Sequence, residues 1–367
     1  MQKFFLLIVC LAGIYFSAKS QNQSLKTENI ILITLDGLRW QEVFGGADSV
    51  LLYNKTFTPN PDELAQSYWA ETAEARREKL MPFFWSVISS RGQLYGNRKF
   101  DNKVNVTNRM WFSYPGYNEI LSGFADDERI HSNDKIENPN QTVLEFVHNQ
   151  PGFKGKVAAF GSWDVFPYIV NQNRSGIPVN AGFPSAPTDH KLTEKEKILY
   201  ELQAQIPEEW GSVRYDAFTH HFAKEYLQKN KPRVLYIAYG ETDDFAHDGA
   251  YNEYLKAAHR TDVFIADIWN FVQNHPKYKD KTTLLITTDH GRGTLPVENW
   301  KHHGIKIPEA DQIWMAVLGP DSPAMGEVKT SGQLYQNQVA KTLAILLGLD
   351  YKNDKPVGAG IPAATGK

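Results

Sequence analysis

The chain has 367 residues, of which 42% are hydrophobic and 22% charged, a composition typical of a globular protein with a substantial core. Its formal net charge of −3 lacks the basic bias of proteins that bind nucleic acid or anionic membranes, so we expect no nucleic-acid-binding surface. The single cysteine, Cys10, excludes an intramolecular disulfide and a multi-cysteine zinc site.

The first twenty residues have the pattern of an export signal. Lys3 precedes an apolar run of about a dozen residues, and Ala18-Lys19-Ser20 supplies the small residues of a cleavage site. An uncleaved anchor is the alternative, although a membrane span needs ~20 apolar residues. We therefore expect residues 1–20 to be removed, no membrane span to remain, and the protein to be periplasmic or secreted. Loss of Cys10 with this segment suits a bacterial exterior, while five Asn-x-Ser/Thr triplets leave a eukaryotic origin open.

Apolar runs and helical patterns alternate along the rest of the chain. Strands are predicted at 29–35, 156–161, 233–240, 282–288 and 312–319, and helices at 80–90, 142–149, 218–230, 251–273 and 332–348. This alternation predicts an α/β fold with a central, mostly parallel sheet and helices on both faces. We expect residues 21–367 to form a single domain. Residues 162–215, rich in Pro, Gly, Asn and Ser, are expected to form an inserted cap near the site.

Three of the predicted strands end in acidic residues or histidine. The first runs into Asp36-Gly37, the third into residues 240–247 (GETDDFAH), and the fourth into Asp289-His290. Because ligands bind at the carboxyl ends of parallel strands, these groups are expected to meet at one edge of the sheet. Each has a simpler interpretation as a turn residue, a helix cap or a surface pair, but three such endings together favour a shared site.

Aspartate and histidine without cysteine are the ligand types of a catalytic zinc or a related divalent ion. Asp243 and His247 are four residues apart, so a helical turn after the strand would put them on one face. Asp289 and His290 are adjacent, so in an extended chain their side chains point in different directions. They can bind one ion only where the strand bends into a loop, and otherwise each would bind a different ion. His302 or His303, just before the last strand, could complete a site.

Ser113 is the candidate nucleophile. It begins a helical pattern that has Pro115 in its first turn, and a helix N-terminus stabilises an anionic oxygen and its phosphoryl group. A metal ion could lower the pKa of this hydroxyl without a partnering base. The alternative is a helix-capping serine. The sequence contains neither a Gly-x-Ser-x-Gly elbow nor a Walker A loop.

Taken in order, these motifs resemble the alkaline phosphatase superfamily, on the branch of the nucleotide pyrophosphatase/phosphodiesterases. The resemblance extends from about residue 29 to the final helix. It implies two zinc ions, with other divalent metals as substitutes, and a covalent phosphoserine formed by in-line attack of Ser113. One ion would be held by Asp36, Ser113, Asp289 and His290, and the other by Asp243, His247 and His303. Which ion Asp289 and His290 each serve stays open, and His302 would be a neighbour only.

The resemblance also implies how a phosphate ester would be bound. Asn133 and the backbone N–H of Tyr114 would donate to phosphoryl oxygens. Ser113 stands where this branch usually has threonine. Trp163 and Val165 stand where related monoesterases carry Lys and Arg, which favours a diester substrate, although Arg39, Arg292 or Lys301 could supply a cation. Independently of the resemblance, Trp163, Phe166, Tyr168 and the segment 162–215 are expected on the leaving-group side, with a packed cap as the alternative.

The sequence leaves alternative functions open. A phosphomonoesterase for phosphate scavenging is the main alternative, followed by a non-catalytic binding protein that keeps the fold. A sulfatase is disfavoured because Tyr117 stands where the formylglycine motif has arginine. A phosphoglycerate mutase is disfavoured because the segment between Ser113 and Asp243 is too short for its inserted domain. The expected partner is a small-molecule phosphate ester, and the sequence leaves the oligomeric state open.

Overall fold

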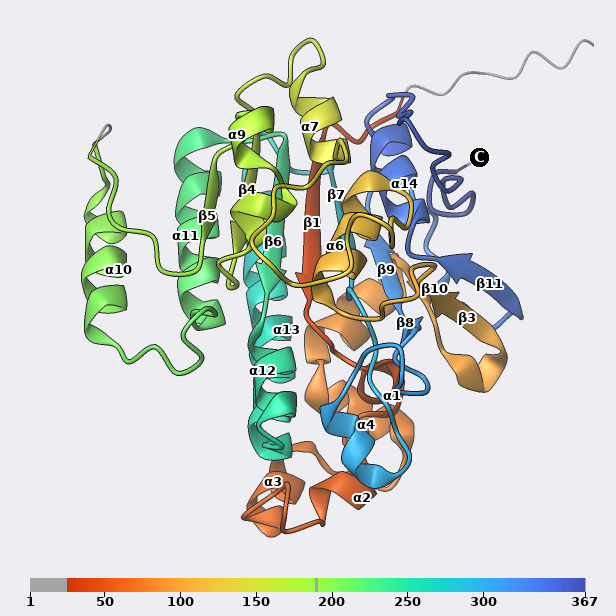
Figure 1. Ribbon diagram of the computed structural model, residues 1–367. Coiled ribbons are helices and arrows are strands. Elements are labelled where there is room, and N and C mark those ends of the chain that lie inside the picture. Colours follow the sequence, from red (N-terminus) through yellow and green to blue (C-terminus); the bar gives the residue numbers. More distant parts are fainter. Residues whose placement is uncertain (1–24, 189–190, 367) are drawn as a thin grey trace, which may run out of the picture.

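The computed structural model of the protein describes residues 25–188 and 191–366, so the predicted signal segment 1–20 lies outside the described residues. A central sheet of eight described strands has the order β10-β2-β9-β7-β1-β6-β4-β5 (Figure 1). The strands are β1 (Asn29–Leu35), β2 (Gln93–Tyr95), β4 (Val157–Gly161), β5 (Val179–Ala181), β6 (Val234–Tyr239), β7 (Thr282–Thr287), β9 (Met315–Leu318) and β10 (Gly326–Glu327). A small second sheet contains β11 (Gly332–Tyr335), β3 (Asn102–Asn105) and β8 (Gln312–Ile313).

Helices cover both faces of the central sheet. Side chains of β1 alternate between two apolar clusters: Ile31 and Ile33 pack in one, and Ile30 and Leu32 in the other. The first cluster contains α1 (Trp40–Gly45), α2 (Ser49–Leu52), α3 (Pro61–Tyr68), α4 (Ala73–Leu80), the π-helical η1 (Phe84–Ile88), α10 (Glu194–Gln205), α11 (Asp216–Asn230), α12 (Glu241–His247) and α13 (Tyr251–Asn274). The second contains α6 (Ser113–Ser122), α7 (Val143–His148), α8 (Phe166–Ile169) and α14 (Gln338–Leu346). Burial on both faces explains why β1 is apolar at nearly every position.

The remaining short helices are α5 (Ser89–Arg91), η2 (Arg98–Phe100), α9 (Gln172–Ser175) and η3 (Val297–Lys301). β1 pairs in parallel with β6 and β7, and β6 with β4, while β9 runs antiparallel to β7. This arrangement confirms the predicted α/β class with a mostly parallel central sheet. Within residues 25–188 and 191–366, no helix combines the length and apolar content needed to cross a membrane.

Two predicted elements differ from the structure. The single strand predicted at 312–319 is divided at Trp314, where β8 pairs with β3 and β9 pairs with β7. The buried Trp314 indole donates to the Leu38 carbonyl at 2.8 Å, which holds the chain at the point where it changes sheet. The helix predicted over 332–348 begins only at Gln338, because residues 332–335 form β11 beside β3.

Residues 162–215, expected to form a cap, contain α8, α9, β5 and α10. β5 joins the central sheet beside β4, and α10 lies at the outer side of α11, at the left of Figure 1.

Candidate active site

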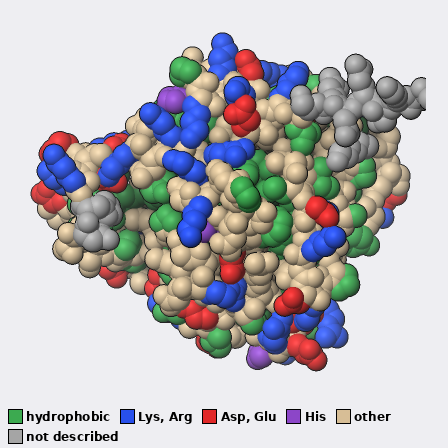
Figure 2. All heavy atoms as spheres, turned by 90° about the horizontal axis from the view of Figure 1, so that it is seen from above, with side chains coloured by type: hydrophobic (Ala, Val, Ile, Leu, Met, Phe, Trp, Pro, Cys, Tyr) green, Lys and Arg blue, Asp and Glu red, His purple; other side chains and the backbone are tan. Residues whose placement is uncertain are grey.

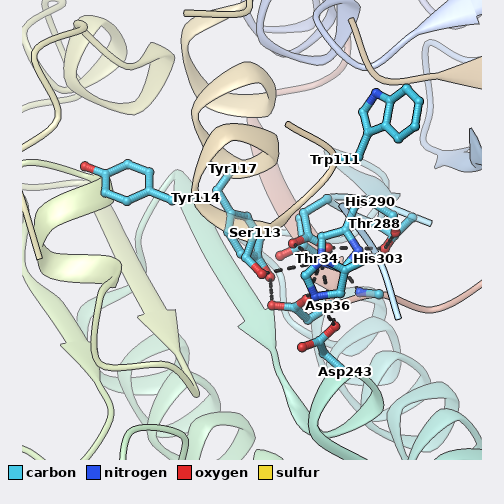
Figure 3. Close-up of polar contacts among 12 residues, drawn as sticks. Thr34, Asp36, Trp111, Ser113, Tyr114, Tyr117, Asp243, Thr288, His290 and His303 are labelled. Carbon is cyan, nitrogen blue, oxygen red and sulfur yellow. Dashed lines mark hydrogen bonds and ion pairs between the residues drawn. The ribbon is translucent and has the colours of Figure 1, made fainter. Parts of the chain in front are cut away.

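The carboxyl ends of β7, β1 and β6 lie side by side and carry Asp289-His290, Asp36 and α12. Thr34 of β1 pairs in register with Thr287 of β7, and Leu35 with Tyr239 of β6. The side chains that follow these strands therefore meet at one place, with Ser113 beside them (Figure 3). The structure thus brings together all seven residues that the sequence predicted as metal ligands.

His290 lies at the centre of the cluster and is fully buried. Its Nε2 is 3.4 Å from Asp36 Oδ1, 3.4 Å from Asp289 Oδ2 and 3.7 Å from Asp243 Oδ1. Its Nδ1–H donates to the Gly291 carbonyl at 3.0 Å, which leaves the Nε2 lone pair directed at the carboxylates.

Two of these oxygens have no partner of their own. Asp36 Oδ1 and Asp289 Oδ2 are buried without a hydrogen bond to any described residue. The other oxygen of each is bonded: Tyr117 donates to Asp36 Oδ2 at 2.8 Å, and the Gly37 N–H to Asp289 Oδ1 at 3.1 Å. Buried polar atoms are rarely left unpaired, so this geometry fits a cation held by Asp36, Asp289 and His290.

A second group lies toward the solvent. Asp243 and His247 lie on one face of α12, with Asp243 Oδ2 3.2 Å from His247 Nε2. His247 Nε2 is 2.9 Å from His303 Nε2, and the His303 ring stacks on His290 with centroids 4.0 Å apart. Asp243, His290 and His303 form a compact set of ligand atoms, so His290 belongs to both groups. The His247 side chain is 42% exposed, so it forms the outer margin of the cluster.

The pKa values of the three aspartates are shifted in different directions. Burial, followed by the charge of Asp243, raises the pKa of Asp36 well above its ordinary value. Burial and Asp36 do the same to the pKa of Asp289. Burial also acts to raise the pKa of Asp243, but Arg292 and then His247 outweigh it and hold that pKa well below its usual range. Arg292 acts in the opposite direction on Asp36 but does not offset burial, so an added positive charge would favour the ionised forms of Asp36 and Asp289.

Arg292 is a buried partner of Asp243 whose contact was not predicted. Its guanidinium forms an ion pair with Asp243 Oδ1 and donates to the Asp243 carbonyl at 3.0 Å and the Lys301 carbonyl at 2.6 Å. The other two suggested cations are also engaged: Arg39 pairs with Glu42, and Lys301 with Glu298 at 2.9 Å. The three cations named from the sequence thus already have acidic partners.

Ser113 opens α6, and its Oγ lies 3.4 Å from His290 Nε2. The preceding residue, Phe112, occupies the N-cap position, and Ser113 makes no capping bond. One turn later, Gly116 packs on the backbone of Asp289, where an added Cβ would lie 2.3 Å from the Asp289 carbonyl oxygen. Tyr117 contacts Asp36. Helix α6 is thus fitted directly against two of the three strand ends.

Buried polar groups hold the segments that carry these side chains. Glu119 accepts hydrogen bonds from the backbone N–H groups of Thr107 and Asn108, each with an oxygen at 2.8 Å. Asn108 Oδ1 in turn accepts from the N–H of Trp111 at 2.9 Å, which fixes the turn before Ser113, where Trp111 has a φ of 54°. Sequence reasoning missed this network because it depends on a buried carboxylate in α6 that contacts a loop, and helical periodicity does not reveal such a contact.

The start of α12 is held in the same way. Asp216, at the first residue of α11, accepts from the N–H groups of Gly240 at 2.7 Å and Glu241 at 3.2 Å. Burial, followed by Glu241, raises the pKa of Asp216 to about 8. This contact was also not predicted, although an aspartate at a helix start is a recognisable signal.

The predicted phosphate-binding groups lie beside Ser113. The Tyr114 N–H donates to Asn133 Oδ1 at 3.0 Å, so a phosphoryl oxygen at this N–H would replace the Asn133 carbonyl. Trp163 is half-buried and packs edge-to-face on Phe166, with centroids 6.4 Å apart. Val165 is only 2% exposed, so of the two positions only Trp163 has substantial accessible surface.

Two comparisons with known proteins identify relatives. Residues 54–341 match the family model described as type I phosphodiesterase / nucleotide pyrophosphatase. Among solved structures, the chain is similar to the alkaline phosphatase PafA, with a TM-score of 0.62 and 12% identity over 94% of this chain and 99% of PafA. It is also similar to the lipoteichoic acid synthase LtaP from Listeria monocytogenes (TM-score 0.57, 12% identity, 92% of this chain and 76% of LtaP).

A 2-O GAG sulfatase is similar as well (TM-score 0.57, 12% identity, 93% of this chain and 75% of that chain). No curated protein sequence matches the chain. At these identities the structural likenesses show the fold, which confirms the predicted alkaline-phosphatase-like architecture.

Proposed function

The chain belongs to the type I phosphodiesterase / nucleotide pyrophosphatase family and is a hydrolase of phosphoric esters, and we propose that it is a two-zinc phosphodiesterase whose nucleophile is Ser113. One observation supports this proposal: the Ser113 hydroxyl, at a helix start, lies beside His290, within a cluster in which Asp36 Oδ1 and Asp289 Oδ2 are buried without a hydrogen-bond partner. This arrangement suits a metal-assisted attack on an electrophilic phosphorus.

The ligand sets are those that the family resemblance implies, and the closeness of these side chains supports them. Asp36, Asp289, His290 and Ser113 would hold one zinc ion, and Asp243, His247 and His303 the other, with Arg292 bonded to Asp243 beside it. When bound, zinc would act as a Lewis acid and lower the pKa of a coordinated hydroxyl group. Nitrogen and carboxylate ligands suit zinc, and they also accept manganese or iron.

The residues around Ser113 would position the reaction. The start of α6 directs the Ser113 oxygen toward the cluster. After losing its proton to solvent, this oxygen would form a bond to phosphorus as the bond to the leaving alkoxide breaks, and the alkoxide would take up a proton. Water would then cleave the phosphoserine and restore the Ser113 hydroxyl. The Tyr114 N–H and the Asn133 amide would donate to phosphoryl oxygens, in place of the hydrogen bond that joins them here. Glu119 and Asn108 would keep the serine at its place on the rim of the cluster.

The surroundings favour a diester over a monoester. Arg39, Arg292 and Lys301 are already paired with acidic groups, and Lys135, two residues from Asn133, pairs with Asp164 at 2.6 Å. A monoester dianion would need a free cation beside its phosphoryl oxygens. A diester carries one negative charge fewer and so needs no such cation. Trp163 supplies an aromatic face on which a second organic substituent could pack. Export through residues 1–20 stays part of the proposal.

Initial rates on three substrates test the proposal. Bis-p-nitrophenyl phosphate, p-nitrophenyl phosphate and p-nitrophenyl sulfate would be compared with zinc supplied. The variants are Ser113→Ala and, as a matched control, Ser122→Ala at the other end of α6, which is also buried. We expect the diester to react fastest, and Ser113→Ala to lose at least about a thousandfold in rate while Ser122→Ala stays near wild type.

Other outcomes point to the alternatives. Faster turnover of the monoester would make the protein a phosphomonoesterase. Turnover of the sulfate would mean a sulfatase. Metal binding without turnover of any of the three would indicate a binding protein that keeps the fold.

A further inference from the structure

The edge of the sheet opposite the active site is strongly basic. Strands β7, β1, β6 and β4 are parallel neighbours, so the segments that precede them lie together. These segments, residues 275–281, 25–28, 228–233 and 149–156, contain nine Lys or Arg residues and only two acidic ones, Glu28 and Asp280. We call these nine cations the basic edge: Lys26, Lys154, Lys156, Lys229, Lys231, Arg233, Lys277, Lys279 and Lys281.

Backbone contacts show that the four segments adjoin one another. The Arg233 N–H donates to the Lys156 carbonyl at 2.7 Å, and the Asn29 N–H to the Lys281 carbonyl at 3.0 Å. Lys277 Nζ donates to the Lys231 carbonyl. Partial burial, followed by the charges of Lys156, Arg233 and Lys231, lowers the pKa of Lys277, as expected for cations held close together.

Most of these charges are not neutralised. Lys281 pairs with Glu28 at 2.7 Å, and Lys229 with Glu196 at 3.0 Å. No carboxylate of the described residues lies within 4.0 Å of the side-chain nitrogens of the other seven. Figure 2, which looks down on this end of the molecule, shows Lys and Arg side chains gathered on the surface with few acidic ones between them.

The shape of this patch fits an extended anionic surface. Four neighbouring strands span about 15 Å, so the cations are spread over separate loops of a broad edge rather than around one anion. Eight of the nine are lysines, which act as flexible point charges; proteins that read nucleic acid rely more on the bidentate contacts of arginine.

We propose that the basic edge binds the surface of an anionic lipid membrane and leaves the active-site edge facing away from it. The net charge of −3 hides this feature because acidic residues elsewhere balance the patch. The inference does not depend on the proposed reaction, since the two sites lie at opposite ends of the same strands.

Co-sedimentation with lipid vesicles tests the proposal. The full chain would be mixed with phosphatidylcholine vesicles or with vesicles containing 30% phosphatidylglycerol (about one lipid in three, enough for a clearly negative surface), at low and at high salt. The test variant carries Lys154→Gln, Lys156→Gln, Lys231→Gln and Lys279→Gln. A control with the same net charge carries Lys55→Gln, Lys79→Gln, Lys99→Gln and Lys329→Gln, at exposed lysines of other segments.

We expect salt-sensitive binding of wild type and control to the anionic vesicles. Each lysine near such a surface contributes about fivefold in affinity, so the test variant should lose two to three orders of magnitude, roughly the product of four such factors. Binding to neutral vesicles measures any attraction that does not depend on charge and should be equal in all three proteins. Equal binding of test variant and wild type to anionic vesicles would overturn the proposal. So would wild-type binding to heparin or an oligonucleotide without binding to vesicles.

Discussion

Replacement of Gly116 by alanine separates two opposite expectations. Gly116 lies inside α6, where helix propensity alone predicts that alanine stabilises the protein by up to about 1 kcal/mol. The packing predicts the reverse, because the new Cβ would lie 2.3 Å from the Asp289 carbonyl oxygen and 2.9 Å from its carbonyl carbon. Both atoms are backbone at the end of a buried strand, so they cannot rotate out of the way.

The size of the effect follows from these distances. A carbon–oxygen contact needs about 3.3 Å, so α6 must move away from β7 by about 1 Å. Overpacking of this kind costs about 1–3 kcal/mol, so even after the full gain in propensity the net loss reaches about 2 kcal/mol. Ser113 moves with α6 relative to the strand ends, and a 1 Å misplacement can cost about a hundredfold in rate.

The assay combines urea denaturation with diester hydrolysis at saturating zinc. The matched control is Gly45→Ala in α1, another helical glycine, at which an added Cβ meets no atom within 4 Å. The control should keep its activity and lose no stability. If Gly116→Ala hydrolyses diesters within twofold of wild type and is as stable as Gly45→Ala, then α6 is not fitted against Asp289 as described.

Two further predictions concern charge. Without divalent metal, Asp289→Asn should melt at a higher temperature than wild type because it removes one of two neighbouring buried carboxylates. Zinc should stabilise wild type but not the variant. Calorimetry with and without EDTA checks both expectations, and equal responses of the two proteins to zinc would contradict them. Burial lowers the pKa of His220 to about 4, whereas in the unfolded chain it is about 6.5. Protonation of His220 therefore favours the unfolded state. The free energy of unfolding should fall by up to about 3 kcal/mol as the pH drops from 6.5 to 4. His220→Gln should remove this part of the pH dependence in urea titrations at pH 7.5, 6 and 5, and unchanged slopes would show that His220 is not its source.

The predictable part of this molecule is the part governed by local pattern. The apolar run 29–35 coincides with β1, and the spacing of Asp243 and His247 fits their place on α12. A parallel sheet adds a rule that does not require contacts to be known: its strands end at one edge. That rule was enough to bring Asp36, Asp243 and Asp289 together, although their role as metal ligands stays a prediction.

The unpredicted part depends on contacts between distant segments. Tyr117 is one helical turn from Ser113, yet its bond to Asp36 joins residues 81 positions apart. The contact of Arg292 with Asp243 joins residues 49 apart. The strand at 312–319 divides because two different neighbours are available on either side of Trp314, which apolar pattern alone does not reveal.

The parallel arrangement of the strands also explains how one fold can carry an acidic active site and a basic edge far apart from each other. Residues that follow the strands bear the carboxylates of the active site, and residues that precede them bear the basic edge, so each set belongs to one end of the sheet. β1 has seven residues, which corresponds to a separation of about 20 Å. This exceeds two Debye lengths at physiological salt, where the length is about 8 Å, so solvent-exposed charges at one end are largely screened from the other. Lysines of the basic edge can therefore change the attraction to an anionic surface while leaving the electrostatics around Ser113 almost unaltered. A shift in the pH profile of hydrolysis on neutralising Lys154, Lys156, Lys231 and Lys279 would mean that the two ends are coupled through the protein interior.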